Sequence, residues 1–219
     1  MWKAEAGQFI GQVAGRSWDG VGRVCAIVSL TLMMVVAGCQ RMMPLDTKPL
    51  DSAGMSYAAI KQLQALNITG AELHEIVKAR TAGLSDDKCI EIVQLYHGRQ
   101  LPFNAGDTVA GLLRARLSGE TILELARLNE LGINAGELQL IRLAGFSDAV
   151  VVEVARQEAA GRPVLSGASL STMKNAGIHE SMLLELLRRG VPDSEAATII
   201  AAHRRGARDV DVLRRYPAT

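Results

Sequence analysis

The residue types that could do chemistry in this chain are histidine, cysteine and one closely spaced serine and lysine. The 219 residues include four histidines: His74, His97, His179 and His203. No two of them have the i, i+4 spacing that puts a metal-binding pair on one helix face. Cys25, Cys39 and Cys89 are also not spaced as a metal ligand set. We therefore expect no metal and no other cofactor.

Ser171 and Lys174 have the Ser-x-x-Lys spacing in which a lysine amine can activate a serine hydroxyl as a nucleophile. The spacing resembles that of the penicillin-binding enzymes, but the S-D-N and K-T-G elements that accompany it there are absent from this chain. We interpret Ser171 as a helix-start residue and predict no catalytic residue and no enzyme. A divergent serine hydrolase stays as an alternative.

An uncharged apolar run, VCAIVSLTLMMVVAGC, occupies residues 24–39 and follows Arg16 and Arg23. A helix that spans a membrane comfortably needs about 20 apolar residues, so this run is short for a span. Its length and its basic flank are typical of the hydrophobic region of a signal peptide.

The end of this run, Val36-Ala37-Gly38-Cys39, resembles the lipobox of bacterial lipoproteins. The resemblance implies cleavage between Gly38 and Cys39, with lipid on the Cys39 thiol and amine. Several acyl chains are needed because a single chain anchors a protein only marginally. It also implies a cell-envelope location, and Gln40 after the lipid site favours the outer membrane, facing the periplasm. The alternatives are an ordinary secretory signal or a membrane anchor with a chance cysteine.

The sequence therefore divides into three parts. Residues 1–38 are a signal peptide, whose N-terminus is over-extended if translation starts near Val21 or Val24. Residues 39–55 carry two prolines and no apolar periodicity, which predicts a tether. Residues 56–219 are predicted to form a helical domain, in which Cys89 is a core residue because Val151 occupies the equivalent position.

Short helices are predicted throughout this domain, because apolar residues recur at steps of three and four. An apolar residue followed by a capping residue precedes most of them: Ile68-Thr69, Leu84-Ser85, Leu117-Ser118, Ile133-Asn134, Phe146-Ser147, Ile178-His179 and Val191-Pro192. Thr69 with Glu72, and Asn134 with Glu137, have capping-box spacing. Glycines before the start signals, at Gly83, Gly132, Gly145, Gly177 and Gly190, are expected to end the preceding helices.

The signals also repeat, since AGLSD at residues 82–86 matches AGFSD at residues 144–148. We predict an all-α array of short helices with about two and a half copies of a ~62-residue, four-helix unit. The pattern over residues 76–190 resembles a helical motif of uncharacterised bacterial envelope proteins. Because that motif consists of caps and core positions, the resemblance implies a fold and no reaction.

Repeated carboxylates have the same periodicity, because Glu91 matches Glu153 and Glu124 matches Glu185. An acid-base pair should be unique, so we expect solvated faces paired with arginines such as Arg127 and Arg188. The C-terminal arginines allow a basic patch for headgroups or an acidic partner, or a solvated helix face, which we favour: Arg188, Arg189, Arg204, Arg205, Arg208, Arg214 and Arg215.

Composition excludes several classes of partner. The net charge is +1, which gives no general field for a nucleic acid, and we predict none as a partner. Aromatic residues make up 4% of the chain, and both tryptophans precede Cys39, which disfavours a cell-wall or polysaccharide-binding module. The favoured function is a lipid-anchored, non-enzymatic envelope protein that binds or scaffolds another protein; the polysaccharide-binding module is kept as the second alternative.

Overall fold

The computed structural model describes residues 45–132 and 134–217, which form twelve α-helices, one 3-10 helix and no strand. The helices are α2 (Lys48–Ser52), α3 (Tyr57–Ala65), α4 (Gly70–Thr81), α5 (Asp86–Gly98), α6 (Gly106–Arg114), α7 (Gly119–Leu128), α8 (Ala135–Leu143), α9 (Asp148–Ala159), α10 (Gly167–Asn175), α11 (Glu180–Arg188), η1 (Asp193–Glu195), α12 (Ala196–Arg204) and α13 (Asp209–Leu213). The predicted all-α array of short helices is confirmed.

Side-chain caps start several of these helices. The hydroxyls of Ser118 and Ser166 accept from backbone amides three residues on, at 3.2 Å each. Thr69 and Glu72 form the predicted capping box, in which each side chain accepts from the other residue's amide. Asn134 does not form the predicted box. The backbone of Asn134 is already helical, and its side-chain amide nitrogen Nδ2 donates to the carboxylate of Glu130 instead.

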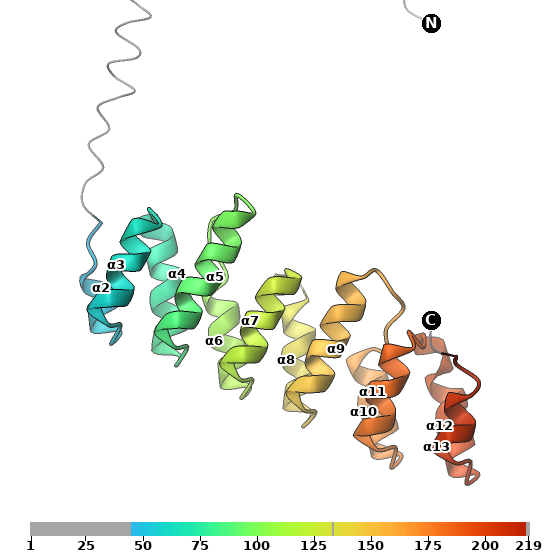
Figure 1. Ribbon diagram of the computed structural model, residues 1–219. Coiled ribbons are helices and arrows are strands. Elements are labelled where there is room, and N and C mark those ends of the chain that lie inside the picture. The colour runs from blue at the N-terminus through green and yellow to red at the C-terminus, as the bar shows by residue number, and fades with distance from the viewer. Residues whose placement is uncertain (1–44, 133, 218–219) are drawn as a thin grey trace, which may run out of the picture. The chain divides into compact units, whose positions relative to one another are not determined.

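The helices lie in two layers (Figure 1). The even layer consists of α2, α4, α6, α8, α10 and α12, and the odd layer of α3, α5, α7, α9, α11 and α13, each helix packing on the next of its own layer. Two antiparallel helices therefore form one structural repeat. Such pairs bury their apolar faces only by stacking on neighbours.

The connections between the layers explain the longer period in the sequence. The connections 99–105 and 160–166, after α5 and α9, are longer than 66–69 and 129–134, after α3 and α7, and α5 and α9 are also longer helices than α3 and α7. The N-caps of the odd helices therefore follow one another at alternating short and long intervals: Ser56, Ser85, Ser118, Ser147 and His179. Two helix pairs together give the period of about 62 residues. The predicted count of four-helix units is not confirmed, because the packing shows helix pairs.

The core lies between the two layers and is continuous through the described residues. It begins earlier than predicted, since Leu50 in α2 and Met55 are buried although the tether was expected to reach residue 55. Pro49 explains the difference. It lies in the first turn of α2, where a proline is tolerated because its missing amide has no partner in the helix anyway.

Helix ends use left-handed backbone, as predicted for Gly83, Gly145, Gly177 and Gly190. Gly132 differs from the prediction, because α7 already ends at Leu128 and the left-handed residue after it is Asn129, whose φ is +66°. Among the described helices, none has the length and apolar character of a membrane span.

Candidate functional site

The predicted lipidation and cleavage residues, Cys39 and Gly38, lie outside the described residues, as does the signal segment 1–38. The structure therefore bears on the other candidates, which all lie in the two layers.

Cys89 is confirmed as a core residue. Its side chain on α5 is 3% exposed. Burial raises the pKa of its thiol to about 12, so it is a poor nucleophile in the folded protein.

Lys174 serves packing between repeats. Its ammonium nitrogen donates to the carbonyl of Gly145 at 2.7 Å and lies 4.5 Å from the centre of the Phe146 ring. Arg142, two helices earlier, occupies the equivalent place and donates to the carbonyls of Phe146 and Arg116. No hydrogen bond joins Lys174 to Ser171 in the described part of the chain.

Glu72 and His97 form a contact that the sequence did not predict. Glu72 is 2% exposed, and its carboxylate lies 2.6 Å from the His97 imidazole nitrogen and accepts from the Phe103 amide at 3.0 Å. Although burial raises the pKa of Glu72, hydrogen bonds from Thr69, Phe103 and His97 outweigh it, and the pKa is lowered. The carboxylate fastens the long 99–105 connection to α4. No three His, Cys, Asp or Glu side chains within residues 45–132 and 134–217 are grouped to hold a metal ion.

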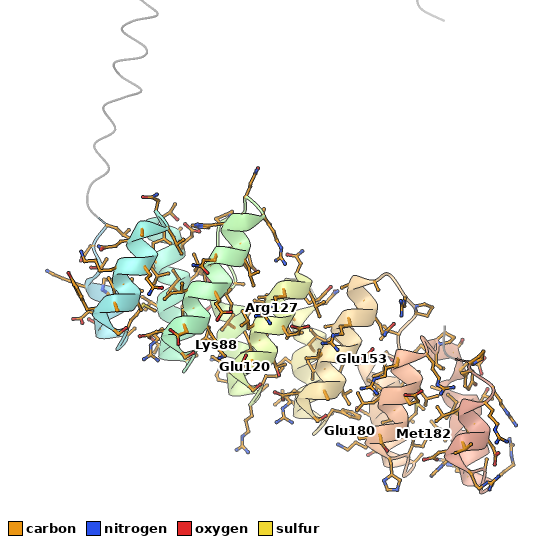
Figure 2. The ribbon with its side chains drawn as sticks, in the orientation of Figure 1. Lys88, Glu120, Arg127, Glu153, Glu180 and Met182 are labelled. Carbon is orange, nitrogen blue, oxygen red and sulfur yellow. The ribbon has the colours of Figure 1, made fainter. Side chains whose placement is uncertain are left out.

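The odd layer carries a ladder of ion pairs that runs from α5 to α11. Alternating acids and arginines lie within 4.0 Å of their neighbours: Glu91, Arg127, Glu124, Arg156, Glu153, Arg188 and Glu185. Figure 2 shows Arg127 and Glu153 within it. The predicted pairs of Glu124 with Arg127 and of Glu185 with Arg188 are confirmed. Glu153 is 7% exposed, however, so the prediction of a solvated face is wrong for that residue.

Four of the seven C-terminal arginines form ion pairs, namely Arg188, Arg189, Arg208 and Arg214, whereas Arg204, Arg205 and Arg215 have none among the described residues. Arg189 binds Glu185 and two backbone carbonyls, and Arg208 and Arg214 both pair with Asp211. For these four arginines, the pairing fits the solvated helix face better than a free basic patch.

Carboxylates at helix starts join neighbouring repeats in the odd layer. Asp148, the first residue of α9, accepts from the Ser118 amide at 2.9 Å and from the Thr121 hydroxyl at 2.7 Å. Asp86 and Glu180 cap the preceding odd helices in the same way. The first residue of α7 is Gly119, which has no carboxylate to make this contact. Between α5 and α7, Lys88 instead pairs with Glu120 at 2.6 Å (Figure 2).

The even layer has a groove of about 500 Å³ between α8 and α10. Its lining is largely apolar or small: Glu137, Leu140, Ile141, Ser166, Gly167, Ala168 and Ser171. Leu140 at its edge is 67% exposed, and Leu143 one turn further along α8 is 61% exposed. Among the large exposed apolar side chains of the described residues, Leu140 and Leu143 lie one turn apart on one helix and form a patch beside this groove, whereas Tyr57 lines a smaller groove near α2 and α3.

Charges of opposite sign flank this patch along α8. At the helix start, Glu158 lies near Glu130 and Glu137, and burial together with these two acids raises its pKa to about 6. At the helix end lie the exposed Arg114, the last residue of α6, and Arg116 just after α6, whose carbonyl accepts from Arg142 of α8. Within the described residues, neither guanidinium has an ion-pair partner.

The candidate site is therefore a surface, which we call the α8 face: the acidic end (Glu130, Glu137 and Glu158), the patch (Leu140 and Leu143) and the basic end (Arg114 and Arg116). The sequence could not separate Leu140 and Leu143 from core leucines, because both fit the helical period. In comparisons with known proteins, no family model, no curated protein and no solved structure matches the chain. The two resemblances noted in the sequence thus rest on its residues alone.

Proposed function

We propose that this chain is a lipid-anchored protein of the bacterial envelope that binds a protein partner with its α8 face. The observation that carries the binding role is the exposed patch of Leu140 and Leu143 beside an apolar groove. Burying one such leucine in an interface contributes about 1.5–3 kcal/mol toward docking a partner. The anchor is supported by the Val36-Ala37-Gly38-Cys39 sequence.

The rest of the surface supports the choice of this face. Charged side chains of the odd layer already pair with one another across neighbouring helices. A partner that bound there would have to replace those pairs at a desolvation cost. The α8 face instead offers apolar area and guanidinium groups free of such pairs.

A photo-crosslinking experiment tests the binding role in the lipidated protein. A photoreactive amino acid replaces Leu140 in one variant and Val210, which is 57% exposed on α13, in the control. We expect a discrete crosslinked protein species from position 140 that is at least about tenfold weaker from position 210. Equal labelling from both positions, or none from position 140, contradicts the proposal.

The same preparation tests the anchor. Labelled fatty acid should enter the wild-type chain and be absent from the Cys39→Ala variant. Retention of the wild-type protein on purified peptidoglycan, with no crosslinked protein, would favour the wall-binding alternative.

A further inference from the structure

We infer that the partner of the α8 face is a second copy of this chain, packed about a two-fold axis that passes near Leu140 and Leu143. The inference deepens the proposed function by naming the partner, but the contact itself does not need the lipid. An isologous dimer brings the same patch of each copy together, so the surface must be complementary to itself.

Charge along α8 meets this requirement. The acidic end lies at the start of the helix and the basic end lies one helix length away, about 13 Å for nine residues. When two such helices pack antiparallel, the acids of each copy face the arginines of the other, and the leucines meet at the centre. Packed parallel, the same ends would place like charges together, which disfavours that arrangement.

Unsatisfied groups sit at both ends of the face. Oε2 of Glu158 is buried without a hydrogen-bond partner, and the like charges of Glu130 and Glu137 lie close to its carboxyl. Arg114 and Arg116 are exposed and without ion-pair partners in the described part of the chain. Contact with a second copy would bring the arginines of one copy to the Glu130 and Glu137 carboxylates of the other.

Small side chains allow the two copies to approach closely. The neighbouring positions carry small residues: Gly136 on the exposed side of α8, and Gly167 and Ala168 at the start of α10. Leu140 and Leu143 are therefore the apolar side chains that protrude furthest from the face. A leucine of one copy can enter the groove beside Ala168 of the other. Anchoring at a membrane would confine both copies to one surface and raise their effective concentration, so even a weak contact would be populated.

Cysteine crosslinking of the full, lipidated chain in its membrane tests the inference. Leu140→Cys is the reporter, because a residue near a two-fold axis lies close to its own copy. Val210→Cys is the control with similar exposure. The buried Cys89 contributes no background. We expect oxidation to give a disulfide-linked dimer through position 140, at least about tenfold more than through position 210.

Charge reversal then tests the geometry. Adding Arg114→Glu and Arg116→Glu to the reporter should lower the dimer yield at least about fivefold. Co-expression with a reporter copy carrying Glu130→Lys and Glu137→Lys should restore a mixed dimer, because the reversed ends then match again. Helicity of each variant is checked by circular dichroism.

Three results would overturn the inference: no dimer through position 140, equal dimer through position 210, or a yield that charge reversal leaves unchanged. A different protein crosslinked at position 140 would also overturn it while leaving the proposed function intact. Loss of lipid with an unchanged dimer would remove the anchor and leave the inference standing.

Discussion

Replacing Asp148 by alanine should loosen the joint between α7 and α9. The carboxylate accepts from the Ser118 amide and the Thr121 hydroxyl, and it lies 3.3 Å from Nε of Arg142. A hydrogen bond to a charged group contributes about 1.5–3 kcal/mol. The side chain is 29% exposed, so water replaces part of what is lost. We expect the free energy of unfolding to fall by about 2 kcal/mol, and the melting temperature by about 4–8 °C.

Asp209→Ala is the matched control. Asp209 is the first residue of α13, as Asp148 is of α9, so both carboxylates interact with a helix N-terminus. Asp209 makes no side-chain hydrogen bond or ion pair among the described residues. Its replacement should cost about 0.5 kcal/mol or less in urea unfolding followed by circular dichroism. Equal losses for the two variants would refute the view that these acids join the repeats.

The stabilisation by Asp148 should depend on pH in a defined direction. Burial alone raises the pKa of Asp148, but its hydrogen bonds with Ser118 and Thr121 and the charge of Arg142 outweigh burial and lower it. A carboxyl whose pKa is lowered by folding stabilises the protein above its unfolded pKa of about 3.9. The difference between wild type and Asp148→Ala should therefore be constant near neutral pH and shrink as the pH falls below about 4. A constant difference down to pH 2 would contradict this.

Three further predictions concern packing and titration. Gly106→Ala should lower the free energy of unfolding by about 3 kcal/mol, because a Cβ there would overlap the backbone of Glu75. Gly70 holds the same position in α4, but a Cβ there meets no atom. In thermal unfolding, Gly70→Ala should therefore be neutral or stabilising by up to about 1 kcal/mol. The Cys89 thiol of the folded, mature chain should react with a thiol reagent at pH 8 at least about 1000-fold more slowly than in urea, and comparable rates would show that it is accessible. Glu158→Gln should stabilise the protein by about 1 kcal/mol at pH 8 and have little effect at pH 4. The reason is that folding raises the pKa of Glu158 to about 6, so its ionised form destabilises the protein as the pH rises through that value. An equal effect at both pH values would contradict the burial of this charge.

Local signals in the sequence predicted the helices well, because each depends on neighbouring residues. Ser118 and Thr69 start helices through bonds to amides three residues on, so their spacing is visible in the chain. The prediction of Ser171 as a helix-start residue is wrong, because α10 begins at Gly167 after the Ser166 cap and Ser171 lies inside the helix.

Contacts between repeats were not predictable from local patterns. The bond from Ser118 to Asp148 joins residues 30 apart, and only the packing of α7 on α9 brings them together. The helix pair was likewise missed as the structural unit, because connections of alternating length make the sequence repeat every second pair.

The α8 face escaped prediction for a related reason. Leu138 with Ile141 and Leu140 with Leu143 have the same three-residue spacing, yet Leu138 is buried and Leu140 is 67% exposed. Which side of α8 meets the odd layer is set by the neighbouring helices, so one sequence cannot tell a core leucine from a docking leucine.

The most direct test of the account is intact-mass analysis of the mature protein from its native membrane. We predict a chain that begins at Cys39 and carries the mass of a diacylglyceryl group and a further acyl chain on that residue. A chain that retains residues before Cys39, or that begins there with an unmodified thiol, would contradict the lipid anchor.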